Sequence, residues 1–227
     1  MKTFILFIFI ALVSHSNAYG SLRYIADGFA QSFREGPAVE VAEETSEERE
    51  VFSQTSSLQI GDTLVTLYTT YGNITIRLFP EKTPLSYENF TTLARQGFFD
   101  NVIFHRVIEN FMIQTGDPTG TGTGSFSAWG HTFSSEPSYL THIRGAVSMA
   151  HAGIGTYGSQ FFIVHEDAHF LNLANNPSGH TVFGQVIDGM DVVDRIAQTQ
   201  TDFSDRPIYY IYIIETSVFT YEGDYEE

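Results

Sequence analysis

The chain has 227 residues, of which 42% are apolar and 15% aromatic. This length and composition allow a buried core, which argues against disorder over the whole chain and favours one domain with an extension. The net charge of −16 disfavours nucleic acid and anionic membranes as partners, and the absence of cysteine excludes disulfides, thiolate nucleophiles and Cys-ligated zinc.

Residues 1–18 have the pattern of a signal peptide. An apolar run from Phe4 to Val13 follows a short basic start, and the small residues Ser16 and Ala18 have the spacing of a signal-peptidase site. Because the run is too short to cross a bilayer, we expect cleavage before Tyr19 and a soluble, exported mature chain. A buried N-terminal element is the alternative. The C-terminus lacks a retention tetrapeptide, which favours secretion over residence in the endoplasmic reticulum lumen.

Both ends of the mature chain are acidic. Residues 19–58 are rich in glutamate and have little periodicity, and residues 218–227 are also acidic. We interpret them as a flexible leader and a solvated tail that flank a folded domain at 59–217. The alternative is a surface that recruits calcium, a mineral or a basic partner. Two sequons, at Asn73 and Asn89, are possible N-glycosylation sites of an exported chain.

From Asp62 onward the pattern is that of a mainly β domain. Alternating apolar residues over 64–68 and 74–78 predict a hairpin. Thr83 followed by Pro84, with Gly97 as a stop, predicts a helix whose N-cap is Thr83. Further strands are expected at 102–107, 111–114, 146–149, 160–164, 182–186 and 208–214, and a second helix at 190–197. These elements predict a closed eight-stranded antiparallel barrel capped by two α-helices.

Four short segments hold the residues that suggest a binding site: 104–108, 111–114, 149–152 and 158–163. Because alternate residues of a strand share a face, Phe104 should project with Arg106, and Gln160 with Phe162. Such residues would form an apolar hollow with a few polar groups at its lip. The plainer interpretation is a barrel core of aromatic residues with an arginine that reaches water.

These segments resemble the signature blocks of a known family. The runs FHRVIENFMIQTGD (104–117), RGAVSMA (144–150), GSQFFI (158–163) and HTVFG (180–184) look like those of cyclophilins, the cyclosporin-binding peptidyl-prolyl cis-trans isomerases. The resemblance covers 62–216. It implies the same barrel, a proline-binding groove on its outer surface, and an enzyme that assists folding by rotating Xaa-Pro bonds, without a cofactor or metal. Its partners would be proline-containing peptides and proteins, and we expect a monomer.

The resemblance also assigns roles to individual positions. The catalytic residues would be Arg106, Gln114 and His105, with support of the fold as the alternative role for His105. Gln114 would steady Arg106. The substrate-binding positions would be Phe104, Phe111, Met112, Ala150, His151, Ala152, Gln160, Phe162, Phe170, Leu171 and His180.

Arginine suits this reaction for a physical reason. Amide resonance holds an Xaa-Pro bond planar behind a barrier of about 18–20 kcal/mol. In the twisted state the prolyl nitrogen regains a lone pair, so a guanidinium that donates a hydrogen bond there stabilises the transition state more than the ground state. No proton has to move, so neither a general base nor a metal is needed.

Three features depart from the family pattern. Phe170 occupies the rim position where most vertebrate cyclophilins have tryptophan, which removes an indole N–H donor and should weaken cyclosporin binding. His151 stands where asparagine is usual, and the family contact there is largely through backbone. The loop 172–179 is longer than the common one, so the rim beside the pocket could be reshaped.

Other readings of the sequence are weaker. His165 to His169 fits H-E-x-x-H, a zinc-hydrolase motif, but it follows an apolar strand instead of opening a long helix. Gly120 to Gly124 lacks the spacing and the lysine of a phosphate loop. The serious alternative is a secreted, acidic matrix or binding protein that uses the fold as a scaffold and associates with calcium or mineral.

Overall fold

The structure of the protein is a computed structural model that describes residues 54–174 and 176–223. The predicted signal peptide, the predicted leader up to residue 53 and the last four residues of the predicted tail lie outside the described residues. None of the helices in the described part combines the length and the apolar composition that a bilayer-spanning segment needs.

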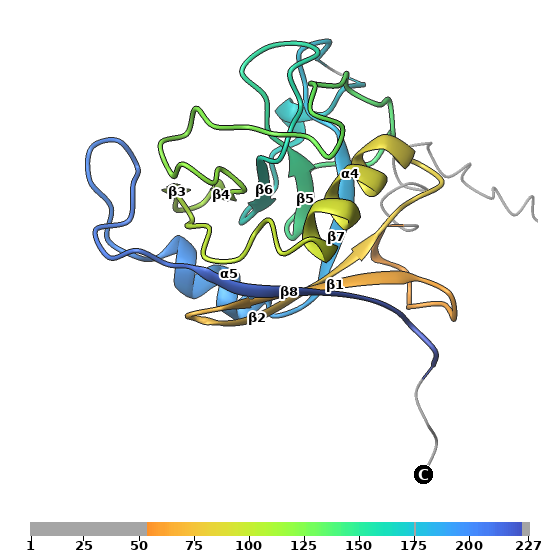
Figure 1. The fold of residues 1–227 in the computed structure, drawn as a ribbon, viewed down its shortest axis with the longest axis horizontal. Helices are drawn as coiled ribbons and strands as arrows, with labels where there is room; N and C mark the ends of the chain where they lie inside the picture. Colours follow the sequence, from red (N-terminus) through yellow and green to blue (C-terminus); the bar gives the residue numbers. More distant parts are fainter. Residues whose placement is uncertain (1–53, 175, 224–227) are drawn as a thin grey trace, which may run out of the picture. The chain divides into compact units, whose positions relative to one another are not determined.

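Eight strands form one antiparallel sheet in the order β3-β4-β6-β5-β7-β2-β1-β8 (Figure 1). The strands are β1 (Thr63–Thr69), β2 (Gly72–Leu78), β3 (Arg106–Ile108), β4 (Met112–Thr115), β5 (Ala146–Met149), β6 (Phe161–Val164), β7 (Val182–Asp188) and β8 (Ile213–Thr220). The helices are α4 (Pro84–Arg95) and α5 (Met190–Ala197), with a short 3-10 helix, η2 (His169–Leu171), after β6. The predicted mainly β architecture with two α-helices is confirmed.

The sheet curls until its two edges meet. Asn101 N donates to Ile213 O, Ile213 N donates to Val102 O, and Phe104 N donates to Ile211 O. These bonds join the segment before β3 to the start of β8 as a short seam. The eight strands are therefore a curled sheet whose closure rests on a few backbone bonds and not on a full ladder between β3 and β8.

Helix α4 begins where the sequence predicts, but its first turn is capped from a distance. Thr83 is the N-cap residue, yet its hydroxyl donates to Phe79 O and makes no capping bond. The carboxylate of Glu136 instead accepts hydrogen bonds from the backbone N–H groups of Leu85 and Ser86, both at 2.8 Å. An acidic group at this end also suits the helix dipole. Local sequence could not reveal a cap supplied from fifty residues downstream.

The prediction of a last strand at 208–214 is wrong, because β8 begins at Ile213 and continues to Thr220. Its residues pair with β1 over the whole length of that strand, for example Val218 with Val65. Most β8 side chains are exposed or half-buried, so apolar alternation does not mark it. The strand also includes 218–220, which the sequence assigned to the acidic tail.

The folded domain also begins earlier than predicted. Gln54 is 1% exposed, although the sequence placed it in the flexible leader. Its amide donates to Thr141 O and to Gln185 Oε1, and its carbonyl oxygen accepts from Thr141 N. A buried amide with all three bonds made is part of the fold. The segment from Gln54 onward therefore packs on the turn before β5 and on β7.

Two apolar clusters lie on opposite faces of the sheet. The larger fills the inside of the curl and contains Ile113, Phe161 and Ile163. The smaller lies outside it and contains Met112, Phe162 and Val164, the neighbours of those residues along the same strands. This alternation is what strand geometry requires. It places the smaller cluster, and whatever binds over it, on the outer surface.

Candidate active site

Strands β3, β4 and β6 form the wall of the candidate site. Arg106 is the register partner of Gln114, and Gln114 is the partner of Phe162. Partners on neighbouring antiparallel strands point to the same face of a sheet. Since Phe161 and Ile113 point into the core, these three side chains line the outer surface together.

A hollow of about 200 Å³ lies over this wall. It is lined by nine residues, all of which the sequence predicted as site residues: Arg106, Phe111, Met112, Gln114, Ala150, His151, Phe162, Leu171 and His180. The volume is below the range of about 300–1,000 Å³ typical of pockets for drug-sized ligands. A hollow of this size suits a single small ring.

The floor of the hollow is apolar and its rim is aromatic. Met112 and Phe162 are 2% and 4% exposed and belong to the outer apolar cluster. At the rim, the rings of Phe170 and Phe111 stack with centroids 5.7 Å apart and an angle of 28°. Phe170 is 64% exposed and does not line the hollow. It extends the apolar surface outward.

Arg106 supplies the positive charge at one edge of the hollow. Its side chain is 43% exposed, and its Nε lies 3.6 Å from Asp205 Oδ2. The predicted contact with Gln114 is not the one observed, because Gln114 Nε2 donates to Gln160 Oε1 at 2.9 Å. Arg106 is therefore paired with Asp205, which the sequence analysis did not single out, and Gln114 is bonded to Gln160.

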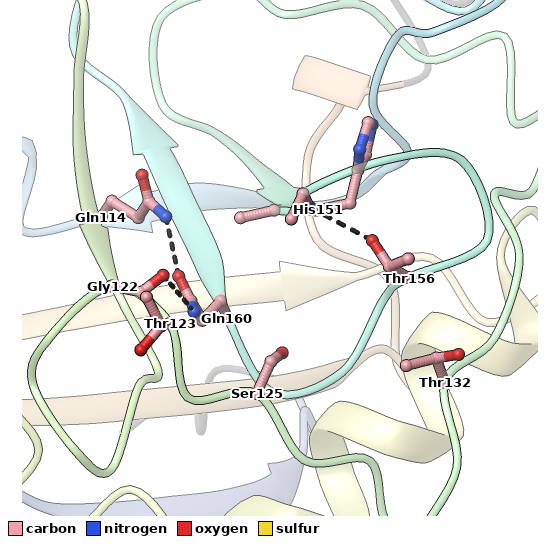
Figure 2. Close-up of a pocket in the computed structure, with 10 residues that line it drawn as sticks. Gln114, Gly122, Thr123, Ser125, Thr132, His151, Thr156 and Gln160 are labelled. Carbon is pink, nitrogen blue, oxygen red and sulfur yellow. Dashed lines mark hydrogen bonds between the residues drawn. The ribbon is translucent and has the colours of Figure 1, made fainter.

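A second hollow, of about 390 Å³, adjoins the first (Figure 2). The two share Gln114, Ala150 and His151. In Figure 2 the amides of Gln114 and Gln160 lie on one side of this hollow, and Thr156 lies on the other. Its further lining residues are Gly122, Thr123, Ser125, Thr132 and Ala152. The predicted positions Gln160 and Ala152 thus belong to a continuous groove beside the small hollow.

The hydrogen bonds fix which way the two amides point. Gln160 Nε2 donates to the carbonyl oxygens of Gly122 and Gly124, so its Oε1 is the atom that accepts from Gln114. Gln114 Nε2 uses one of its two N–H groups for that bond, so its carbonyl oxygen faces away from Gln160 and can accept from a ligand or from Arg106.

The loop that carries these carbonyl groups is folded around Asp117. This carboxylate is fully buried and accepts from Thr119 N, Gly122 N and Gly124 N. Although burial opposes ionisation, these hydrogen bonds together lower the pKa of Asp117. The ionised carboxylate therefore sets the loop that orients Gln160.

Two histidines line the opposite wall. The rings of His151 and His180 stack with centroids 4.2 Å apart, and His180 Nδ1 lies 2.9 Å from Met149 O. Burial lowers the pKa of His180, and the neighbouring His151 lowers it further. A neutral imidazole is therefore favoured at His180, whereas Arg106 brings a permanent positive charge to the small hollow.

A third histidine, His142, lies behind the floor and was missed by the sequence analysis. It is fully buried, and its ring stacks on Phe162 at 5.9 Å and 14°. Its Nδ1 lies 2.8 Å from Asn172 Oδ1, and its Nε2 lies 2.9 Å from Ser148 Oγ. Burial lowers the pKa of His142 to about 4, against the effect of the Asn172 hydrogen bond. This neutral ring supports the floor.

Two predicted site residues lie elsewhere. Phe104 is fully buried in the inner core, because the chain is not in strand conformation at 104–105 and the alternation with Arg106 is lost. His105 is 5% exposed and lines neither hollow. Burial lowers the pKa of His105, and it lies beneath Gly122 of the loop that orients Gln160. The structure thus places His105 as a support of the loop and Phe104 as a core residue.

The two sequons differ in accessibility. Asn73 is exposed at the start of β2. Asn89 is 1% exposed, its Nδ2 donates to Gly158 O, and its Oδ1 accepts from Ala128 N. A glycan on Asn89 is incompatible with this fold, because the amide nitrogen is buried and already bonded.

The H-E-x-x-H pattern does not form a metal site here. His165 follows β6 and accepts a hydrogen bond from Asn110 N, whereas His169 opens η2 and lies 3.6 Å from Asp167. Zinc hydrolases need both histidines on one helical face. Within residues 54–174 and 176–223, no three side chains of the ligating types gather in one place.

Comparison with known proteins agrees with this architecture. Residues 64–218 match the family model described as "Cyclophilin type peptidyl-prolyl cis-trans isomerase/CLD". The chain is 44% identical over 159 residues to peptidyl-prolyl cis-trans isomerase CYP18-2 of Arabidopsis thaliana, covering 68% of this chain and 92% of that protein. It is 43% identical over 195 residues to CYP71 of the same plant, covering 79% of this chain. It spans about a third or less of that protein and of two further relatives.

A solved structure shows the same fold. The crystal structure of a cyclophilin type peptidyl-prolyl cis-trans isomerase of Cryptosporidium parvum superposes with a TM-score of 0.66 at 35% identity, covering 70% of this chain and 99% of that one. The same protein was also solved in the presence of the dipeptide Ala-Pro. The family model covers most of the chain, and the eight antiparallel strands with two α-helices agree with the fold that the resemblance implied. The chain therefore belongs to the cyclophilin-type peptidyl-prolyl cis-trans isomerase family.

Proposed function

We propose that the protein catalyses cis-trans isomerisation of Xaa-Pro bonds, with the proline ring in the small hollow and the preceding residues along the larger one. The observation that carries this proposal is that Arg106 lines the same hollow as the apolar residues Phe111, Met112 and Phe162. A ring-sized apolar site with a permanent hydrogen-bond donor at its edge is what rotation about a prolyl amide requires. The related structure solved with Ala-Pro supports a proline dipeptide as the minimal ligand.

The floor of the hollow and Arg106 have different roles. The floor of Met112 and Phe162 removes the proline ring from water, which favours the less polar twisted amide over the resonant planar one. Arg106 donates to the prolyl nitrogen as the nitrogen becomes pyramidal, so the bond strengthens in the transition state. The carbonyl oxygen of Gln114 is free to accept from the guanidinium or from a peptide N–H once the substrate is bound.

Replacing Arg106 by alanine in the full chain tests this function. We expect the catalytic efficiency in a protease-coupled assay of an Xaa-Pro tetrapeptide to fall by about 10²–10³-fold, the usual effect of removing one transition-state donor. Arg106→Lys should recover part of the loss, because lysine keeps the charge without the planar fork. Arg95→Ala, at an exposed position in the last turn of α4, is the matched control. An Arg106→Ala enzyme as active as the wild type would overturn the proposal and favour a scaffold role.

We further propose that the protein acts on exported clients, since residues 1–18 have the pattern of a signal peptide. Expression in secretory cells followed by N-terminal sequencing should give a chain in the medium that begins at Tyr19. Because Asn73 is exposed and Asn89 is buried, one glycan at most is expected, and Asn73→Gln should abolish any shift after glycosidase treatment. A full-length chain retained in the cytoplasm contradicts the proposal, and retention in the endoplasmic reticulum lumen contradicts secretion but not export.

A further inference from the structure

Figure 1 shows a loop between α5 and β8. Hydrogen bonds within this loop fold it. Asp202 Oδ1 accepts from Ser204 N and Arg206 N, while Asp202 N donates to Arg206 O at 2.8 Å. Asp205 N donates to Asp202 O. A carboxylate that ties the backbone of the following residues makes a tight turn of defined shape. The position of Asp205 is therefore fixed by the loop.

The same loop is attached to the candidate site at two points. Asp205 O accepts from Val107 N, in the middle of β3, at 2.7 Å. The guanidinium of Arg206 donates to Gly120 O, in the loop that orients Gln160. Asp205 therefore lies directly against the edge strand that carries Arg106.

Asp205 adopts a backbone conformation that few residues tolerate. Its φ is +59°, in the left-handed region where asparagine, aspartate and glycine are the usual residues. This conformation, together with the Val107 bond, turns its carboxylate toward β3. The Oδ2 atom lies 3.6 Å from Arg106 Nε.

The contact uses the inner nitrogen of the guanidinium and leaves the outer ones free. Within the described residues, Nη1 and Nη2 of Arg106 have no hydrogen-bond partner, while the side chain lines the small hollow. A long arginine side chain that is 43% exposed has many rotamers. The Asp205 carboxylate beside Nε favours the Arg106 rotamers in which the two terminal nitrogens face the hollow.

We propose that Asp205 is a positioning residue of the isomerase: it holds Arg106 with its terminal nitrogens toward the prolyl nitrogen. This inference rests on the proposed role of Arg106. Asp205 itself does not line the hollow, so it acts on the orientation of the donor and not on substrate binding. Because only the transition state uses that donor fully, the effect belongs to kcat and not to KM.

The experiment compares wild type, Asp205→Asn and Asp205→Gly in the full chain. Both variants tolerate the left-handed backbone, and both remove the negative charge. We expect each to lower kcat by about two- to fivefold with KM unchanged, the range for an exposed ion pair. Glu109→Gln, which removes a carboxylate from the exposed turn between β3 and β4, is the charge-matched control and should leave kcat unchanged.

Salt provides a readout that a merely structural role would not move. Raising NaCl from about 0.01 M to about 1 M shortens the Debye length from about 30 Å to about 3 Å and screens the pair. The kcat of wild type should therefore fall toward that of Asp205→Asn, whose own kcat should stay nearly constant.

The outcomes separate this inference from the function on which it rests. An Arg106→Ala enzyme that stays active would overturn both the proposed role of Arg106 and the positioning role of Asp205. If Arg106→Ala is inactive but Asp205→Asn keeps or exceeds the wild-type kcat, only the positioning role fails, and a rise would mean that the ion pair draws Arg106 away from the substrate. A loss confined to KM, a similar loss in Glu109→Gln, or a difference that salt does not reduce would also overturn it.

Discussion

The floor of the small hollow and its Arg106 edge are built in different ways. The floor residues Met112 and Phe162 are almost fully buried, lie on paired strands and rest on an apolar cluster. Arg106 is close to half exposed and is held by an ion pair from a loop about one hundred residues further along the chain. Close-packed apolar contacts are rigid and tolerate little change, whereas an exposed ion pair is weak and responds to salt.

The contrast suggests that the floor determines binding and stability, whereas the Arg106 edge determines the rate of the reaction. The floor should set whether a proline ring binds and whether the domain stays folded. The Arg106 edge should set how fast the bound imide rotates, with little effect on stability. Three changes, taken from the largest expected effect to the smallest, can break or sharpen this division.

Truncating the floor should have the largest effect. Phe162→Ala should lower the free energy of unfolding by about 3–5 kcal/mol, as a buried phenylalanine does when it is replaced by alanine, and should remove most of the activity. Urea denaturation measures the first quantity, and the coupled assay per folded molecule measures the second.

The adjacent Phe161 is the matched control for that change. It is fully buried in the same strand but points to the inner core, where it packs on Phe90 and Phe99. Phe161→Ala should cost similar stability while the folded fraction stays active. If both variants lose activity equally, the floor has no role beyond folding. The corresponding leucine variants repeat the comparison where the alanine variants do not fold.

Acidification should lower the free energy of unfolding through His142, which lies behind the same floor. His142 stacks on Phe162, and burial lowers its pKa from the ordinary 6.5 to about 4. Since the folded state disfavours the proton, the stability that this group contributes is fully present above about pH 6.5 and is lost as the pH falls toward 4. A shift of this size corresponds to about 3 kcal/mol, and the lowered pKa of His180 acts in the same direction.

The test is the pH dependence of unfolding in wild type and His142→Gln. Carboxylates also titrate in this range, so the difference between the two curves is the informative quantity. The variant cannot titrate at this position and should lose less stability between pH 6.5 and 4. Parallel curves would contradict the assigned role of His142.

The same division separates what the sequence could predict from what it could not. The floor lies in segments that resemble the signature blocks of cyclophilins, and that resemblance assigned site roles to all nine residues of the hollow. Asp205 lay in a segment that no periodicity marks, and its contact with Arg106 depends on a left-handed turn and on closure of the sheet. The sequence also did not predict the inward orientation of Phe104, because a break in the strand leaves no mark on the apolar pattern. It did not predict the bounds of β8, because most side chains of that strand are exposed or half-buried.

Changing the rim should have the smallest effect on catalysis. Phe170 stacks on Phe111 but does not line the small hollow, so Phe170→Trp should change kcat and KM for a short peptide by less than about twofold. Tryptophan adds an indole N–H at an exposed position, and one new hydrogen bond to a large ligand corresponds to about three- to tenfold in affinity. Cyclosporin should therefore inhibit this variant at lower concentrations than wild type. Phe170→Leu, which keeps apolar area without a ring, should show no such gain. If Phe170→Trp instead changes turnover of the short peptide as strongly as Asp205→Asn does, the rim takes part in catalysis and the division between a shaping floor and a reacting edge is too simple.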